Sequence, residues 1–162
     1  MTLNARSEAV RRRLLRPWNF RLYLWARLPL AACAGLSLRR LDEAACTVAL
    51  PGGWRTQNPF RSMYFAAQSM AAEMSTGAPA MMLVEGASAS VSMLVREVRG
   101  VFDRRIQGEA EFTFEDMAAM RETVDRAVAT GESESFVARS VGRNRDGGAA
   151  SAFEITWSFK RR

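Results

Sequence analysis

One carboxylate interrupts an otherwise apolar segment of this sequence. Glu73 lies in NPFRSMYFAAQSMAAEMSTG, residues 58–77, whose other members are mostly small or apolar. Burial among Met70, Ala72 and Met74 would raise the pKa of this carboxyl group and make it a better general base. Glu73 could then activate a water molecule or attack a carbonyl carbon directly. The alternative is an ordinary acid at the surface or at a subunit interface.

Histidine is absent from all 162 residues, and this absence limits the available chemistry. It excludes Ser-His-Asp and Cys-His mechanisms and metal sites that depend on histidine. Cys33 and Cys46 are isolated in apolar surroundings, so we expect no metal site and interpret both as buried, reduced thiols of a cytoplasmic protein. Any catalysis must therefore depend on carboxylates, hydroxyls, amides and arginine.

The positive charge of the chain comes almost entirely from arginine. The formal net charge is +6, and Lys160 is the single lysine. A basic surface suits an anionic partner such as nucleic acid, anionic lipid or a phosphorylated small molecule. Trp18, Tyr23 and Trp25 lie among arginines near the N-terminus, and we interpret them as covering one end of the core. Docking of residues 1–28 on a membrane or nucleic acid is the alternative.

The N-terminal part of the chain is predicted to be helical. Asn4 can cap a helix over residues 5–16, and Asn19 can cap a second helix over residues 20–28. The length of the chain indicates one domain, residues 1–162. We expect a helical extension over residues 1–41 and the core of the domain over residues 42–162.

Hydrophobic patterns predict the elements of that core. A helix is expected over residues 58–77, and a second helix runs from Glu115 until Gly131 stops it. Short alternating or apolar runs predict strands. The expected strands are residues 45–51, 79–86, 91–105 (with a bulge near Gly100), 108–116, 135–141 and 150–160. One buried helix against a mostly antiparallel sheet is an α+β layout.

This order of elements resembles the hotdog fold, and more narrowly the PaaI-like acyl-CoA thioesterases and the DUF4442 branch related to them. The likeness extends from about Pro29 to Lys160. NPFRSMYFAAQSMAAEMSTG is similar to the central-helix motif, VFDRRIQGEAEF to a strand pair, and FEITWSFK to the last strand. LPLAACAGLSLRRLDEAACTVALP is similar to the segment that leads into the first strand of the DUF4442 branch. The resemblance implies a five- to six-stranded antiparallel sheet wrapped around a central helix, with N-terminal helices added.

The resemblance also assigns roles to single residues. Glu73 falls on the catalytic acid, with Gly77 four residues later as the motif expects. Asn58, fifteen residues before the acid, falls on an amide that places water or substrate. Phe65 stands where a backbone N–H polarises the thioester carbonyl, and Tyr64 stands where the family often has histidine. The His-Gly-Gly of the family is Tyr-Phe-Ala here.

Four further side chains are candidates for contact with the substrate. Ser69 and Thr76 lie at i−4 and i+3 from the acid, on the same helical face. Arg104 and Arg105 could contact the phosphates of CoA, or could lie at a solvated strand end. Gln68 lies on another face of the helix, where a subunit interface is its expected place.

The resemblance implies hydrolysis of an acyl-CoA or related thioester by a homodimer or homotetramer, because hotdog sites generally lie between subunits. No cofactor is expected beyond the CoA of the substrate, and no nucleic acid partner. The alternative is a non-catalytic hotdog protein that binds an acyl group or CoA. The changed His-Gly-Gly positions are the reason to consider it.

Overall fold

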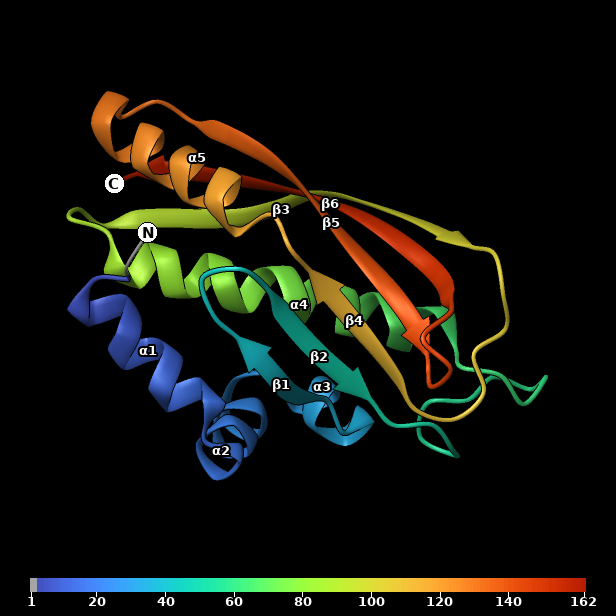
Figure 1. Ribbon diagram of the computed structural model, residues 1–162. Helices are drawn as coiled ribbons and strands as arrows, with labels where there is room; N and C mark the ends of the chain where they lie inside the picture. Colours follow the sequence, from blue (N-terminus) through green and yellow to red (C-terminus); the bar gives the residue numbers. More distant parts are fainter. Residues whose placement is uncertain (1–2) are drawn as a thin grey trace.

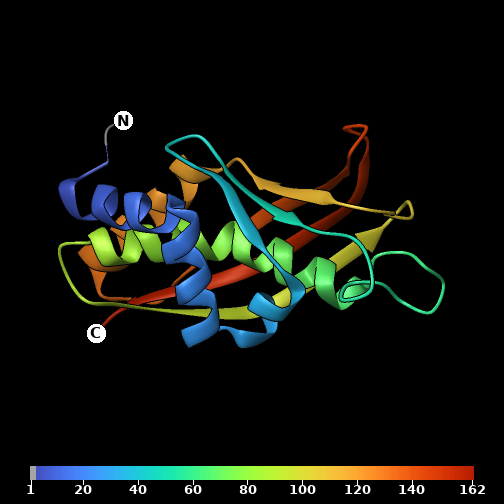
Figure 2. The ribbon, with the colours of Figure 1, turned by 90° about the horizontal axis from the view of Figure 1, so that it is seen from below.

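The computed structural model describes residues 3–162, which form a six-stranded sheet curved around one long helix (Figures 1 and 2). The strands are β1 (Ser37–Leu41), β2 (Cys46–Leu50), β3 (Val91–Phe102), β4 (Ala110–Phe114), β5 (Glu134–Asn144) and β6 (Ala149–Arg161). Their order is β1-β2-β4-β5-β6-β3, and every neighbouring pair is antiparallel. The predicted α+β class is confirmed, and β1 and β3 form the two edges.

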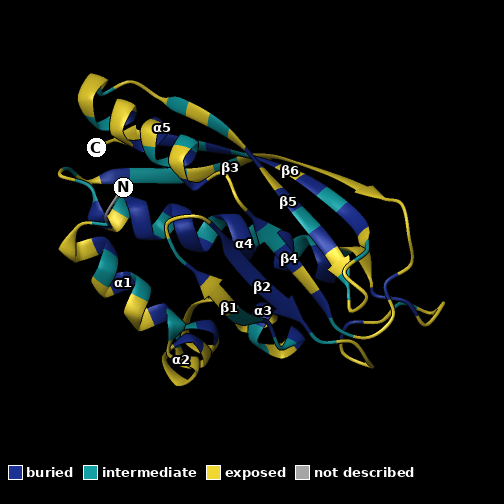
Figure 3. Cartoon of the chain, in the orientation of Figure 1, coloured by how far each residue is buried: buried dark blue, intermediate teal, exposed yellow. Residues whose placement is uncertain are grey.

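The central helix is α4 (Phe65–Gly86), which contacts five of the strands and is the most deeply buried helix in Figure 3. Alanines 67, 71, 72, 78 and 80 of α4 are buried, and such small side chains let the sheet approach the helix closely. From the sheet, β6 buries alternate residues against the helix, as the sequence predicted. These are Phe153, Ile155, Trp157 and Phe159.

The prediction of a helix over residues 58–77 followed by a strand over residues 79–86 is wrong. Helix α4 begins at Phe65, continues through Gly77 and Pro79, and ends at Gly86. Because residues 79–86 are almost all apolar, alternation could not separate a strand from a buried helix. Proline and glycine are weak helix formers, but the surrounding sheet and helices stabilise the helical conformation here.

Three helices precede the sheet: α1 (Ala5–Leu15), α2 (Pro17–Arg27) and α3 (Pro29–Ala34). The predicted cap of α1 is confirmed, because the Ser7 N–H donates to Asn4 Oδ1 at 2.9 Å. The predicted cap at Asn19 is wrong. Helix α2 starts at Pro17, whose fixed φ and missing N–H suit the first helical position. Strand β1 also lies inside the segment that was predicted to be wholly helical.

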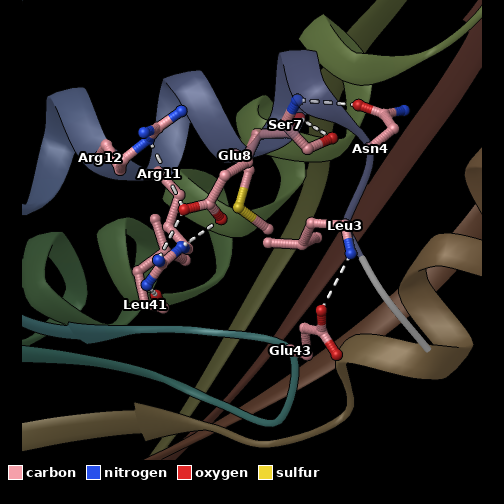
Figure 4. Close-up of polar contacts among 9 residues, drawn as sticks. Leu3, Asn4, Ser7, Glu8, Arg11, Arg12, Leu41 and Glu43 are labelled. Atoms are coloured by element: carbon pink, nitrogen blue, oxygen red, sulfur yellow. Dashed lines mark hydrogen bonds and ion pairs between the residues drawn. The ribbon is translucent and has the colours of Figure 1, made fainter.

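Polar contacts attach α1 to the core (Figure 4). Asn4 Nδ2 donates to the Gly86 carbonyl at 2.8 Å, and the Ser7 hydroxyl donates to the Met82 carbonyl at 3.2 Å. Glu8 pairs with Arg11 at 2.7 Å, and Arg11 Nη1 donates to the Leu41 carbonyl of β1 at 3.5 Å. Helix α1 is therefore anchored on the C-terminal half of α4.

Two smaller predictions concern the end of α5 and the bulge in β3. Helix α5 (Met117–Thr130) ends as expected at Gly131, which has a φ of 77°. It packs on β5 and β6 through Met120 and Val124. The bulge in β3 lies between Val95 and Glu97 rather than near Gly100.

Candidate active site

A groove of about 490 Å³ opens at the N-terminal end of α4. Its walls come from the loop before α4, the first turn of α4 and the loop that follows β3. Five of the residues selected from the sequence line it: Asn58, Tyr64, Phe65, Arg104 and Arg105. The remaining three, Glu73, Ser69 and Thr76, lie further along α4.

The first turn of α4 presents a free backbone donor to this groove. No side chain caps the helix at Tyr64, whose own N–H donates to the Thr56 carbonyl at 2.7 Å. Within residues 3–162, the Phe65 N–H meets no acceptor. A helix N-terminus also carries partial positive charge, so this N–H can receive a developing oxyanion.

Aromatic rings form one wall of the groove. The Phe65 ring lies 4.9 Å from the Tyr64 ring and 6.3 Å from the Phe102 ring, measured between centroids. All three side chains remain substantially exposed. They provide an apolar surface against which an extended chain can lie.

Asn58 shapes the loop at the mouth of the groove. Its Oδ1 accepts hydrogen bonds from the Phe60 N–H at 2.9 Å and from the Ser62 N–H at 3.2 Å. The Ser62 hydroxyl lies 3.2 Å from the same oxygen. These are the bonds of an Asx-type turn, so the side-chain NH₂ is the group left to meet a ligand.

Gln68 is a groove residue that sequence reasoning placed elsewhere. Its side chain is buried, and Nε2 donates to the Met63 carbonyl at 3.1 Å. Its Oε1 has no hydrogen-bond partner among the described residues. The sequence did contain a signal for this placement. Gln68 is a single amide among alanines, about one turn after the start of a helix without a capping side chain.

Arg104 and Arg105 add positive charge at the rim. Both are exposed in the loop after β3, and the Arg104 N–H holds this loop by donating to the Ala150 carbonyl at 3.0 Å. Neither guanidinium pairs with a carboxylate of the described chain. Both remain available to an anionic ligand.

Glu73 is half-buried two turns further along α4. Burial raises the pKa of its carboxyl group, and no described residue forms a hydrogen bond or ion pair with that group. A Cβ placed on Gly77 would lie 3.0 Å from Glu73 Oε1 and 3.3 Å from the Trp157 ring. The glycine therefore leaves room for the carboxylate beside the indole.

Within one chain, the Glu73 carboxylate and the Phe65 N–H are too far apart to act on the same thioester group. Glu73 follows Phe65 by eight residues, which is about 12 Å along the helix axis. The two residues share one face of α4, together with Ser69 and Gly77 at intervals of four residues. These four residues form a partly exposed stripe along α4, and its Phe65 end lies at the groove.

The two hydroxyl residues near Glu73 are engaged elsewhere. Ser69 Oγ donates to the Phe65 carbonyl at 3.0 Å. Thr76 is fully buried; its Oγ1 donates to the Glu73 carbonyl at 3.0 Å and accepts from Trp157 Nε1 at 2.9 Å. Thr76 thus fixes the indole that packs beside the acid.

The described residues contain no group of His, Cys, Asp and Glu side chains that could hold a metal ion. Cys46 is buried as expected, and burial raises the pKa of its thiol. The expectation of burial is wrong for Cys33, because α3 buries Ala31 and Ala34 and leaves Cys33 exposed.

No protein-family model and no curated protein matches the sequence, but solved structures do. A Pseudomonas aeruginosa protein of unknown function, named a probable thioesterase, superposes with a TM-score of 0.73 at 17% identity, over 93% of this chain and 99% of that one. A Haemophilus influenzae thioesterase superposes with a TM-score of 0.65 at 12% identity, over 86% and 88%. The chain has the hotdog fold.

A Staphylococcus aureus thioesterase with this hotdog fold is also similar, at 14% identity. It superposes with TM-scores of 0.62 and 0.64, over 80% and 82% of this chain and 96% and 98% of that one. In one of these structures alanine replaces a glutamate. In the other, alanine replaces a glutamine that lies fifteen residues before that glutamate.

Proposed function

We propose that this hotdog protein hydrolyses an acyl-CoA or related thioester and belongs to the DUF4442 branch of PaaI-like proteins. One observation carries the proposal. The half-buried Glu73 carboxylate has no hydrogen-bond or ion-pair partner within the described chain, and it lies on the partly open face of the helix whose first turn offers the Phe65 N–H. An acid with a raised pKa and a free helix N-terminus are the two groups that thioester hydrolysis needs.

Each group has a distinct role in this reaction. The Phe65 N–H donates to the thioester oxygen, which gains negative charge when the carbonyl carbon is attacked. Glu73 removes a proton from the attacking water, or attacks first and forms an anhydride that water then hydrolyses. In both routes the CoA thiolate leaves and takes a proton. Arg104 and Arg105 lie at the mouth of the groove, where the phosphates of CoA would meet solvent.

The separation between Glu73 and Phe65 supports a site built by two subunits. Strand β3 is an edge strand of 12 residues, and its apolar side chains Leu94 and Val101 are 66% and 53% exposed. Long apolar edges are normally covered, and a second copy can cover this one by pairing with it. Two-fold pairing of β3 would place the α4 helices of both subunits side by side. The acid of one subunit would then approach the first turn of α4 in its partner, in a homodimer or in each half of a homotetramer.

The Staphylococcus aureus structures add support from residue spacing. The substituted glutamine and glutamate of that thioesterase are fifteen residues apart, which is also the separation of Asn58 and Glu73. We propose that the Asn58 NH₂ group helps to place the attacking water, since its oxygen already holds the loop.

Substitution of Glu73 tests the proposal. Glu73→Gln keeps the shape of the side chain, and we expect kcat on a panel of acyl-CoA esters to fall by about 10²- to 10⁴-fold. Glu85→Gln is the matched control, because this exposed acid lies on the same helix and pairs with Arg13. It should leave kcat unchanged. The proposal fails if the wild-type protein turns over no member of the panel, or if Glu73→Gln retains full activity.

A second function, binding of an acyl group or CoA without hydrolysis, is favoured by one observation. Tyr64, Phe65 and Ala66 occupy the positions of His-Gly-Gly, and the Phe65 ring occupies space beside the oxyanion donor. Calorimetric binding of acyl-CoA without release of free thiol would select this function. Release of thiol that depends on Glu73 would exclude it.

A further inference from the structure

Helix α2 exposes an apolar stripe to solvent. Trp18, Leu22 and Trp25 recur at intervals of four and three residues, which places them on one face, and they are 74%, 67% and 56% exposed. Phe20 and Leu24 bury the opposite face. The interpretation that the N-terminal aromatics cover the core is therefore wrong for Trp18 and Trp25.

Two further exposed leucines lie just beyond the end of α2. Leu28 and Leu30 follow it in the chain, and both are exposed. Tyr23, in contrast, is half-buried and points its hydroxyl at the Met81 sulfur, 3.6 Å away. We call the exposed set, Trp18, Leu22, Trp25, Leu28 and Leu30, the α2 patch. Five exposed large apolar side chains within residues 18–30 are unusual on a free surface.

The net charge of the protein comes from the N-terminal segment that contains this patch. Residues 1–30 contain seven arginines and one acid, Glu8, and therefore carry a charge of 7 − 1 = +6. The whole chain also carries +6, so residues 31–162, with 16 basic and 16 acidic residues, sum to zero. Arg16, Arg21 and Arg27 are exposed and flank the patch directly. These guanidinium groups give the surroundings of the patch a positive charge.

A groove beside the patch carries the same combination of groups. It has a volume of about 890 Å³, and Leu22 and Leu28 belong to its lining. Arg13 and Arg27 contribute guanidinium groups; Arg13 pairs with Glu85 at 3.3 Å, whereas Arg27 forms no ion pair within residues 3–162. The groove has room for a small anionic group next to apolar side chains.

We propose that the α2 patch docks this protein on an anionic lipid surface. Tryptophan and leucine on one face of a helix, with arginine beside them, is the combination by which helices bind in the plane of the lipid headgroups. The arginine side chains can extend their guanidinium groups toward lipid phosphates while the apolar residues enter the acyl boundary. None of the helices within residues 3–162 is long and apolar enough to cross a membrane, so the contact is peripheral.

Charge and chemistry favour lipid over the other occupants of the patch. Two-fold pairing of the patch with its copy would place its arginines against the same arginines, which repel one another. Nucleic acid would use the arginines and the indole rings, but it offers no apolar phase to Leu22, Leu28 and Leu30. A lipid surface uses both sets of groups.

Vesicle co-sedimentation tests the proposal on the full chain. We expect binding to vesicles of phosphatidylcholine and phosphatidylglycerol at least tenfold tighter than to phosphatidylcholine alone, and weakened by salt. The double variant Trp18→Ser/Trp25→Ser should weaken binding at least tenfold. Arg21→Gln should weaken it about fivefold. The matched control is Trp54→Ser, because Trp54 is 86% exposed outside the patch; it should bind as the wild type does.

Four results would overturn the proposal. The first is no binding of the wild type to anionic vesicles. The second is a double variant that binds vesicles as tightly as the wild type. The third is a double variant whose elution in gel filtration shows a smaller assembly, because the patch would then be a subunit interface. The fourth is tighter binding of the wild type to a single-stranded oligonucleotide than to vesicles, lost in the double variant.

Discussion

The hydrogen bond between Trp157 and Thr76 permits a prediction with a defined magnitude. Both side chains are buried, and Trp157 Nε1 donates to Thr76 Oγ1 at 2.9 Å. Thr76→Val keeps the branched shape but removes the acceptor, so the indole N–H remains buried without a partner. Such a group costs about 1–3 kcal/mol. In a domain of this size each kcal/mol lowers Tm by about 2–4 °C, so we expect a decrease of roughly 2 to 12 °C.

Urea and thermal denaturation of four proteins measure this cost: wild type, Thr76→Val, Trp157→Phe and the double variant. Phenylalanine has no donor to leave unsatisfied, so Thr76→Val should be at least about 1 kcal/mol less destabilising in the Trp157→Phe background. Equal costs in the two backgrounds would refute the reasoning. The Thr76 hydroxyl would then not be satisfying the indole. An unchanged KM for acyl-CoA in Thr76→Val would agree with a structural role for this hydroxyl.

Three further predictions concern α4 and its contacts. Gly86→Ala places a methyl group on the Ser7 hydroxyl, so we expect a loss of about 1–3 kcal/mol in urea denaturation, partly restored by adding Ser7→Ala. Gly77→Ala crowds the Glu73 carboxylate and the Trp157 ring, so we expect kcat to fall. The free energy of unfolding should change by less than about 1 kcal/mol, because the higher helix propensity of alanine offsets the crowding. An unchanged kcat would contradict the placement of the acid. Burial raises the pKa of the Glu73 carboxyl group, so the folded state loses stability as pH rises from the unfolded pKa through the folded pKa. Urea titrations between about pH 4 and pH 8 should therefore show Glu73→Gln gaining stability over the wild type as pH rises, and a constant difference would exclude the shift.

The strands were predictable wherever one face is buried and the other exposed. Ala110, Phe112 and Phe114 alternate with polar residues, and β4 lies within the predicted range 108–116 with this inner face. The extent of α4 was not predictable in the same way. Gly77 and Pro79 are typical stop signals in a short-range interpretation, and only the enclosing sheet makes a continuous helix the stable choice.

Part of the candidate site was also predictable from the sequence, and part depends on the folded structure. Residue spacing and the family resemblance placed Glu73 and Phe65 on one helix, and both residues do lie on α4. The hydrogen bonds that occupy the Asn58 oxygen, and the burial of Gln68 in the groove, depend on loop conformation. The exposure of Trp18 depends on which face of α2 packs, and the aromatic residues of that helix lie on both faces.

Strand order also determines when each strand can pair during synthesis. Among residues 3–162, β3 pairs with β6 alone. Their registered partners are 49 residues apart at Phe102 and Ser151, and 70 residues apart at Val91 and Arg161. A ribosome adds about 5–20 residues per second, so β3 is synthesised on the order of 3 to 14 s before the last residue of its partner strand. During that interval both backbone edges of β3 are unpaired and its apolar side chains are available to other nascent chains. The period just before β6 is complete is therefore the time at which this protein most needs protection from aggregation.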